Sequence, residues 1–186
     1  MRRHDETREQ LLSEGLRSYF KALCAIKEFQ DEIAAACVDI LSERIPEIAK
    51  ALGKDIDPKR IEPSPVRPAH QEAWLGALIR RDPAPWDFHL GLYWNVGDSN
   101  TGWVRASVLV EIDTKKELEK YLNVFRNAGI RRPPSSYSYS GSYGAEFGED
   151  MQPSDFAVVR EKLKELLGEW IQVWSKCGGL TAILGK

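Results

Sequence analysis

The sequence predicts an α+β fold, in which a central antiparallel β-hairpin and a third strand are packed by long N- and C-terminal helices. Three observations lead to this prediction. Apolar and polar residues alternate over residues 86–112, apolar residues follow a helical spacing through the first 44 residues, and a second helical stripe covers residues 154–177. The expected order of elements is α-α-β-β-α-β-α.

The N-terminal helical region is expected over residues 1–53. Its apolar positions alternate between spacings of four and three, which keeps them on one side of a helix. One helix from Asp5 to Arg44 would be about 60 Å long, whereas a compact chain of this size has a radius of gyration near 16 Å. Three outcomes stay open: a bend near Gly15, packing on the rest of the chain, or a homodimer through this helix. The seam is Leu12, Leu16, Tyr19, Leu23, Ile26, Gln30, Ile33, Cys37 and Ile40.

Prolines divide the next part of the chain. Pro46 is expected to begin a second helix that runs to Leu52. Residues 54–67 are polar and proline-rich, which is typical of a linker. The α+β domain is then expected over residues 68–186, as one compact unit with the N-terminal helices. Its first element is predicted as a short helix over residues 68–81, because Pro68 can open one and Trp74, Leu75, Leu78 and Ile79 would be buried by it.

The hairpin follows from strict alternation on both sides of a Gly- and Asn-containing turn at residues 97–102. If Val96 lies opposite Gly102, the apolar face of one strand matches the apolar face of the other pair by pair. This register pairs Trp94 with Val104, Leu92 with Ala106, Leu90 with Val108 and Phe88 with Val110. A slip of two residues would preserve the agreement, so the pattern determines the face of each residue and leaves the register open.

Two helices and a third strand complete the fold. Thr114 and Glu117 match a capping box at the start of a helix that Gly129 follows. Ser154 is expected to cap the C-terminal helix, which runs to Cys177. Between these helices, Tyr137, Tyr139, Tyr143, Ala145 and Phe147 share one phase. This alternation favours a third strand, and a mobile loop is the alternative.

The composition limits the function classes. The 186 residues include 26 Lys and Arg and 28 Asp and Glu, a formal net charge of −2. This balance makes nucleic acid an unexpected partner. The charged start of the chain leads into no signal-peptide core, and no apolar run reaches the ~20 residues of a membrane span. We therefore expect a cytoplasmic protein without a membrane partner, in which Cys24, Cys37 and Cys177 are buried apolar residues.

The candidate site is the outer face of the hairpin, opposite the apolar face. It combines aromatic and charged side chains of the types found at binding hot spots. Tyrosine with serine and glycine in the following segment also suits an adaptable contact surface. A solvated or helix-covered sheet face is the alternative interpretation. The candidate binding residues are His89, Tyr93, Trp103, Arg105, Glu111, Tyr137, Tyr139 and Tyr143.

No motif in the sequence specifies a reaction. A phosphate-binding loop, a dinucleotide fingerprint, a nucleophile elbow and a zinc-protease helix are all missing, so neither a cofactor nor a metal is predicted. We therefore expect a non-enzymatic binding or regulatory protein, whose partner is another protein or a small ligand. The enzymatic alternative is a metal-dependent hydrolase or nuclease that uses carboxylates near the hairpin, such as Asp87 and Glu111.

Overall fold

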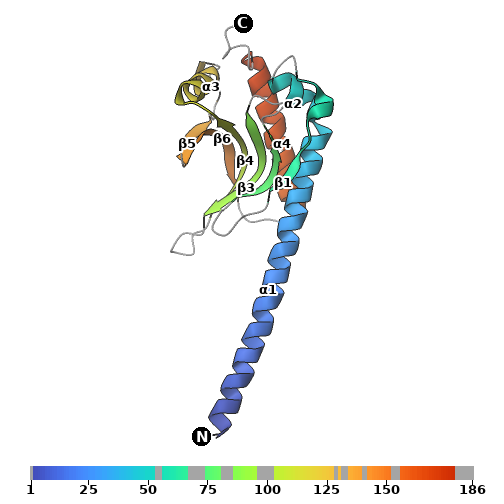
Figure 1. Cartoon of the computed structure of the whole chain (residues 1–186), viewed down its shortest axis with the longest axis vertical. Helices are drawn as coiled ribbons and strands as arrows, with labels where there is room; N and C mark the ends of the chain where they lie inside the picture. Colours follow the sequence, from blue (N-terminus) through green and yellow to red (C-terminus); the bar gives the residue numbers. More distant parts are fainter. Residues whose placement is uncertain are drawn as a thin grey trace. The chain divides into compact units, whose positions relative to one another are not determined.

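The structure of the chain is a computed structural model that describes residues 2–52, 56–66, 74–80, 86–95, 103–127, 130, 134–139, 142–151 and 156–178. The chain forms two compact units, Met1–Glu32 and Ile33–Lys186. The described helices are α1 (Arg2–Glu43), α2 (Ile45–Leu52), the single 3-10 turn η1 (Pro58–Arg60), α3 (Lys115–Asn127) and α4 (Phe156–Lys176). The strands are β1 (Ser64–Val66), β2 (Trp74–Ile79), β3 (Asp87–Asn95), β4 (Trp103–Ile112), β5 (Ser135–Tyr139) and β6 (Ser142–Met151) (Figure 1). The α+β class is therefore confirmed.

The break between the first two helices lies where the sequence predicts it. α1 is helical through Gly15 and ends at Glu43, and Pro46 is the second residue of α2. A proline there costs little, because the first amide groups of a helix have no intrahelical acceptor. The Arg44 guanidinium at the junction contacts the Glu47 carboxylate at 2.6 Å. The expected second helix is thus confirmed. The buried residues of its apolar face are Ile48, Ala49, Ala51 and Leu52.

The six strands form one antiparallel sheet in the order β1-β2-β3-β4-β6-β5. The hairpin of β3 and β4 has one of the registers that the sequence left open, with Phe88 opposite Val110, Leu90 opposite Val108 and Leu92 opposite Ala106. These residues are buried, and they define what we call the core face of the sheet. The predicted hairpin is confirmed, but the sheet has six strands where three were expected.

The helix predicted for residues 68–81 is wrong, because Trp74–Ile79 is strand β2. A short apolar run does not distinguish a strand from a buried helix. Here Leu75, Ala77 and Ile79 lie opposite Leu92, Leu90 and Phe88 of β3, so pairing with the hairpin buries the run on the core face. The same sheet extends into the expected linker, where Ser64–Val66 pairs with β2 as strand β1.

The third strand predicted in the tyrosine-rich segment is two strands. β5 and β6 pair with each other, and Tyr139 lies opposite Ser142. The alternation seen in the sequence therefore does not continue through this segment in one phase. Tyr143 shares the core face with Ala145 and Phe147, whereas Tyr137 is paired with Gly144, a residue of the other phase of β6.

Helices α3 and α4 pack on the core face through a cluster of aromatic rings. Trp170 of α4 lies 4.8 Å from Phe88 between ring centroids, and Phe125 of α3 lies 5.3 Å from Trp174. The buried polar atoms of this cluster have partners, since the Trp170 indole donates to the Tyr121 hydroxyl at 2.9 Å. Burial raises the pKa of the Tyr121 hydroxyl well above its usual value. The expected core helix at the C-terminus is thus confirmed.

Local signals at the helix ends are also confirmed in part. The amide of Glu117 donates to the Thr114 hydroxyl at 3.2 Å, as expected of the capping box that opens α3. The expected cap Ser154 and the end of the chain after Gly178 lie outside the described residues. The expectation that all three cysteines are buried is wrong for Cys24, which is exposed on α1. Cys37 is buried, and burial raises the pKa of its thiol to about 12.

Candidate functional site

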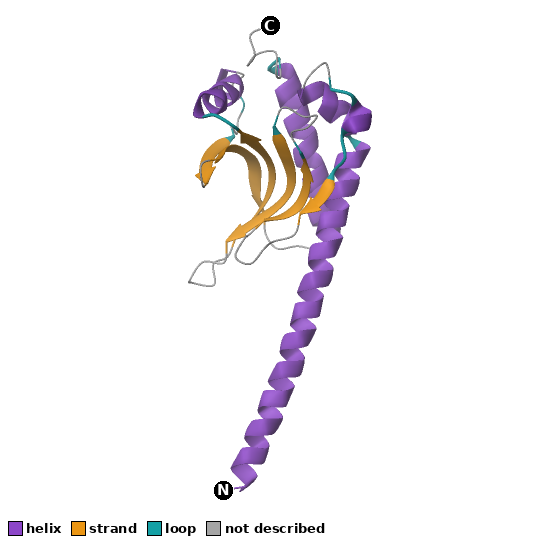
Figure 2. Cartoon of the chain, viewed as in Figure 1, coloured by secondary structure: helices purple, strands orange, loops and turns teal. Residues whose placement is uncertain are grey.

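The face of the sheet opposite the core face carries the candidate site, and we call it the outer face. Side chains alternate between the two faces along each strand. Because Phe88 and Leu90 point into the core, His89, Gly91 and Tyr93 of β3 lie on the outer face. The sheet is curved, and α4 lies along its convex side, so the concave side is turned away from this helix (Figure 2).

A row of small residues crosses the outer face at right angles to the strands. Gly76 of β2 lies opposite Gly91 of β3, Gly91 lies opposite Ser107 of β4, and Ser107 lies opposite Gly148 of β6. We call these four residues the small-residue row. Larger side chains flank it on both sides. On one side they are Trp74, Tyr93, Arg105 and Asp150, and on the other they are Leu78, His89, Leu109 and Glu146.

The backbones of β2 and β3 approach each other closely at the small-residue row. A Cβ atom on Gly76 would lie 2.1 Å from the Leu90 carbonyl oxygen, and one on Gly91 would lie 2.2 Å from the Leu75 carbonyl oxygen. Both distances are shorter than any real Cβ contact, and the atoms that would have to move belong to the backbone. Only glycine fits such an approach. These two positions of the row therefore require glycine.

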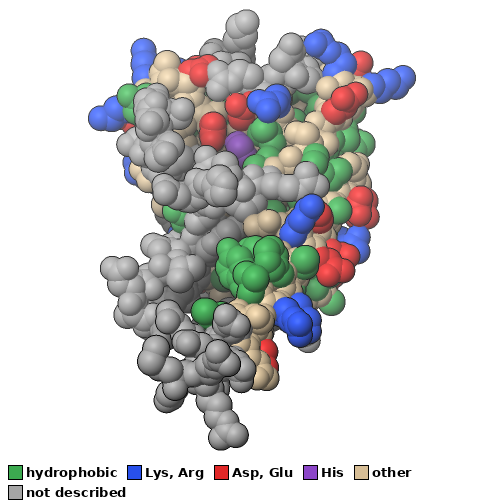
Figure 3. Space-filling model, turned by 60° about the horizontal axis from the view of Figure 1, so that its bottom comes forward, with side chains coloured by type: hydrophobic (Ala, Val, Ile, Leu, Met, Phe, Trp, Pro, Cys, Tyr) green, Lys and Arg blue, Asp and Glu red, His purple; other side chains and the backbone are tan. Residues whose placement is uncertain are grey.

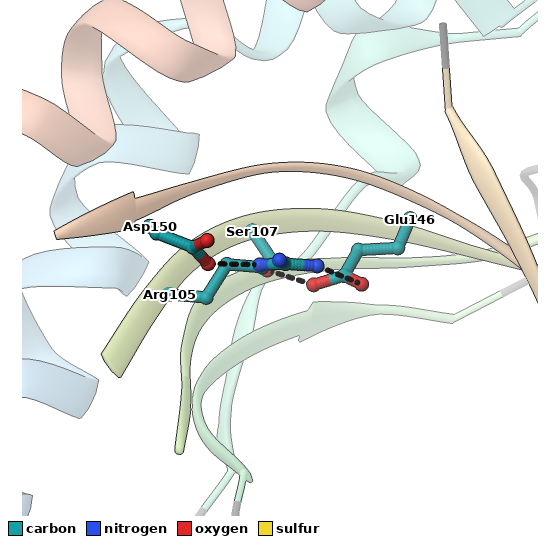
Figure 4. A network of polar contacts seen from close by, with 4 residues as sticks. All are labelled: Arg105, Ser107, Glu146 and Asp150. Atoms are coloured by element: carbon teal, nitrogen blue, oxygen red, sulfur yellow. Dashed lines mark hydrogen bonds and ion pairs between the residues drawn. The ribbon is translucent and has the colours of Figure 1, made fainter. Parts of the chain in front are cut away.

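One end of the small-residue row is covered by an ionic network (Figure 4). The Arg105 Nε atom donates to Asp150 Oδ1 at 2.7 Å, and its Nη1 atom donates to Glu146 Oε2 at 3.3 Å. The Ser107 hydroxyl donates to the other oxygen of Glu146 at 2.5 Å. A Cβ atom on Gly148 would lie 2.9 Å from both Arg105 Cδ and Ser107 Oγ, so glycine at this position leaves room for the network.

The hydrogen bond between Arg105 and Asp150 favours the ionised forms of these two groups. The hydrogen bond with Asp150 raises the pKa of the Arg105 guanidinium, and the same bond lowers the pKa of the Asp150 carboxyl. The Arg105 and Asp150 side chains are 31% and 67% exposed. Pairs with such exposure typically contribute ~0–1 kcal/mol to stability. The network thus serves mainly to fix the position of the Arg105 side chain on the outer face.

The other end of the small-residue row is bordered by Trp74 and His89. Their rings meet edge to face, with centroids 5.9 Å apart. Three buried nitrogen atoms of this pair lack a hydrogen-bond partner among the described residues: Trp74 Nε1, His89 Nδ1 and His89 Nε2. The Glu111 carboxylate approaches His89 Nε2 only to 3.5 Å. Buried polar groups are usually paired, so these nitrogens are an exception that the described residues do not explain.

Burial determines the charge of His89. The side chain is only 12% exposed, and loss of hydration lowers the pKa of its imidazole to about 4. The negative charge of Asp87 opposes this shift, and the positive charge of Arg80 adds to it. The imidazole is therefore neutral at pH 7, with one nitrogen that donates and one that accepts.

The buried imidazole predicts that stability depends on pH. The unfolded chain binds a proton at His89 below about pH 6.5, whereas the folded chain does so only below about pH 4. Stability should therefore fall as the pH is lowered from 6.5 to 4, by on the order of 2–3 kcal/mol. Urea unfolding across this range measures the loss. In the variant His89→Gln this part of the pH dependence should disappear, and its persistence there would show that another group causes it.

The structure brings together only some of the candidate residues. His89, Tyr93, Arg105 and Glu111 lie on the outer face, as expected. Tyr143 instead lies on the opposite face, partly buried against the core, because β5 and β6 are separate strands. The side chains of Trp103, Tyr137 and Tyr139 lie outside the described set, although these residues belong to β4 and β5.

Several residues of the outer face were not predicted as part of a site. The sequence predicts a helix at Trp74 and Gly76, predicts a strand without known neighbours at Glu146, and assigns Asp150 to no element. Gly91 was visible in the sequence as a glycine at the centre of an alternating strand. Such a glycine is a known signal of close backbone approach.

Figure 3 shows a histidine among acidic, basic and hydrophobic side chains on one face of the molecule.

Comparisons with known proteins leave the chain without an assigned family. No protein-family model, curated protein or solved structure matches it. Within the described residues, no group of three or more His, Cys, Asp or Glu side chains could hold a metal ion. None of the described helices is long and apolar enough to span a membrane.

Proposed function

We propose that this protein is a binding protein that holds a small ligand, or a short segment of a partner protein, on the outer face of its sheet. The observation that carries the proposal is the pair formed by Trp74 and His89, whose three buried ring nitrogens lack a described partner. A ligand that supplies these hydrogen bonds would remove the cost of burying unpaired polar atoms, about 1–3 kcal/mol for each group.

The chemistry of the pair favours a ligand with adjacent acceptor and donor groups. The Trp74 indole is a donor only, whereas the neutral His89 imidazole offers one donor and one acceptor. An amide or lactam has a carbonyl acceptor beside an N–H donor and so complements both rings. Tyr93 lies opposite Trp74 and is 39% exposed, so part of its side chain faces solvent beside the pair.

Two further observations support a role in binding. Gly76 and Gly91 of the small-residue row add no side chain to the outer face beside Trp74 and His89. The ionic network also holds Arg105 beside Tyr93, directly across the strands. Rigid aromatic and arginine side chains are those that most often dominate binding energy. Together they give the face a fixed set of contacts that needs little reorganisation when a ligand arrives.

An NMR titration of the isotope-labelled full chain tests the proposal. The probes are planar amides, benzamide and nicotinamide, and the readouts are the Trp74 indole N–H and His89 ring resonances. We expect at least one probe to shift both, and the variants Tyr93→Ala and His89→Gln to weaken its binding by about tenfold or more. Val158→Ala is the matched control, because Val158 is exposed on α4 and should leave binding unchanged. Probe shifts of equal size in the wild type and in both outer-face variants would contradict the proposed site.

A further inference from the structure

Helix α1 carries an exposed apolar stripe. Leu12, Leu16 and Leu23 are 41–64% exposed, although leucine is usually buried. Monomeric proteins rarely expose a contiguous apolar patch larger than a few hundred Å². We call the full set the α1 stripe: Leu11, Leu12, Leu16, Tyr19, Phe20, Leu23, Ile26 and Phe29.

The centre of the α1 stripe follows a heptad repeat. Leu16 and Leu23 occupy one heptad position, and Leu12, Tyr19 and Ile26 occupy the other. The same spacing continues to Ile33, Cys37 and Ile40, which are at most 1% exposed within the core of the second unit. The heptad residues from Leu12 to Ile26 therefore have the apolar pattern of a buried helix seam, although their side chains are exposed. Such a seam packs best against another helix that carries the same heptad repeat, because the two helices supercoil around each other only when both apolar seams have this period.

Charge and shape favour a second copy of this chain as the matching helix. The heptad positions from Leu12 to Ile26 carry no charge, so two identical seams meet without repulsion. The charged residues Glu14, Lys21 and Glu28 are also seven residues apart, on the opposite side of the helix. Gln30 continues the heptad on the seam. A single polar residue at such a position typically fixes the register of a coiled coil.

The size of the α1 stripe is sufficient for a stable pair. A fully exposed aromatic side chain offers ~150–250 Å². Eight large side chains that are about half exposed, five of them aliphatic and smaller, therefore offer at most roughly 800 Å² per copy, which approaches the area that a standard interface takes from each partner. We propose that two copies of this protein associate through the α1 stripes, which form a two-stranded coiled coil.

Sedimentation equilibrium of the full chain tests the association. The expected mass is twice the 21.1 kDa of one chain. The double variant Leu16→Glu, Leu23→Glu places two charges in the seam and should raise the dissociation constant of the dimer by at least about 100-fold. Lys21→Glu is the matched control, since it makes the same change in net charge on the opposite side of the helix. The control should sediment as the wild type does. The double variant Leu16→Met, Leu23→Met keeps the seam apolar, so it should also sediment as the wild type does.

A fold measurement separates loss of association from unfolding. All six tryptophans lie at residue 74 or later, so tryptophan fluorescence reports only on the second unit. The urea unfolding midpoint of the second unit should be the same in the glutamate variant and in the control. A wild-type mass of one chain at high micromolar concentration, or of three or more chains, would overturn the proposal. A glutamate variant that stays dimeric would overturn the assignment to the α1 stripe.

Discussion

Replacement of Gly91 by alanine should destabilise the second unit by about 3 kcal/mol or more. The added Cβ would lie 2.2 Å from the Leu75 carbonyl oxygen and 2.8 Å from the Gly76 Cα atom. Backbone atoms in a paired strand have no free direction in which to move, so β2 and β3 must separate. Overpacking in a core typically costs ~1–3 kcal/mol even where side chains can adjust. Urea unfolding followed by tryptophan fluorescence measures the loss.

The same substitution at Gly15 provides the control. A Cβ atom there meets nothing within 4 Å, and the residue lies inside α1. Alanine is a better helix former than glycine by about 0.5–1 kcal/mol, so Gly15→Ala should raise the helix content seen by circular dichroism. An unfolding midpoint of Gly91→Ala equal to that of the wild type would show that the two strands are not in close contact.

Replacement of Trp174 by alanine should remove about 4–5 kcal/mol of stability. Trp174 is fully buried, and its ring contacts Trp86, Tyr121, Phe125 and Trp170. Removal of a buried tryptophan leaves a large cavity and typically costs ~3–5 kcal/mol. It also removes the donor of the 2.6 Å hydrogen bond to the Ala51 carbonyl oxygen, which joins α4 to α2. Chemical denaturation measures the total.

Two further variants separate the contribution of ring packing from that of the hydrogen bond to the Ala51 carbonyl oxygen. Trp174→Phe retains most of the ring contacts and loses the indole donor, so its cost should be about 1–3 kcal/mol. Val158→Ala on the exposed side of α4 should cost less than ~0.5 kcal/mol. If Trp174→Phe were as damaging as Trp174→Ala, the hydrogen bond to α2 rather than ring packing would dominate the stability of this region.

The hairpin could be predicted from the sequence because its two signals agree. Both β3 and β4 alternate strictly, and the apolar residues match in only a few registers. Strand β2 could not be predicted in the same way, since Trp74–Ile79 is a continuous apolar run between prolines. Its conformation depends on pairing with β3, which lies farther along the chain. Contacts between distant segments override local preferences in such a run.

The face on which each candidate residue lies could be predicted only as far as the hairpin extends. His89, Tyr93, Arg105 and Glu111 were placed correctly because alternation alone determines their face. Trp74 and Glu146 come from the strands on either side of the hairpin, so their approach to His89 and Arg105 depends on the order of the strands in the sheet. That order is a property of the whole fold, and no short motif in the sequence encodes it.

The two edge strands of the described sheet differ in how readily they can pair with a strand from another chain. Unpaired backbone groups on an edge strand are a template for aggregation, and short strands and prolines protect against it. β1 has only three residues, and its central Pro65 lacks an amide hydrogen. β5 at the other edge has five residues and no proline. An added strand, whether from a misfolded copy or from an extended peptide, would therefore extend the sheet more readily at β5 than at β1.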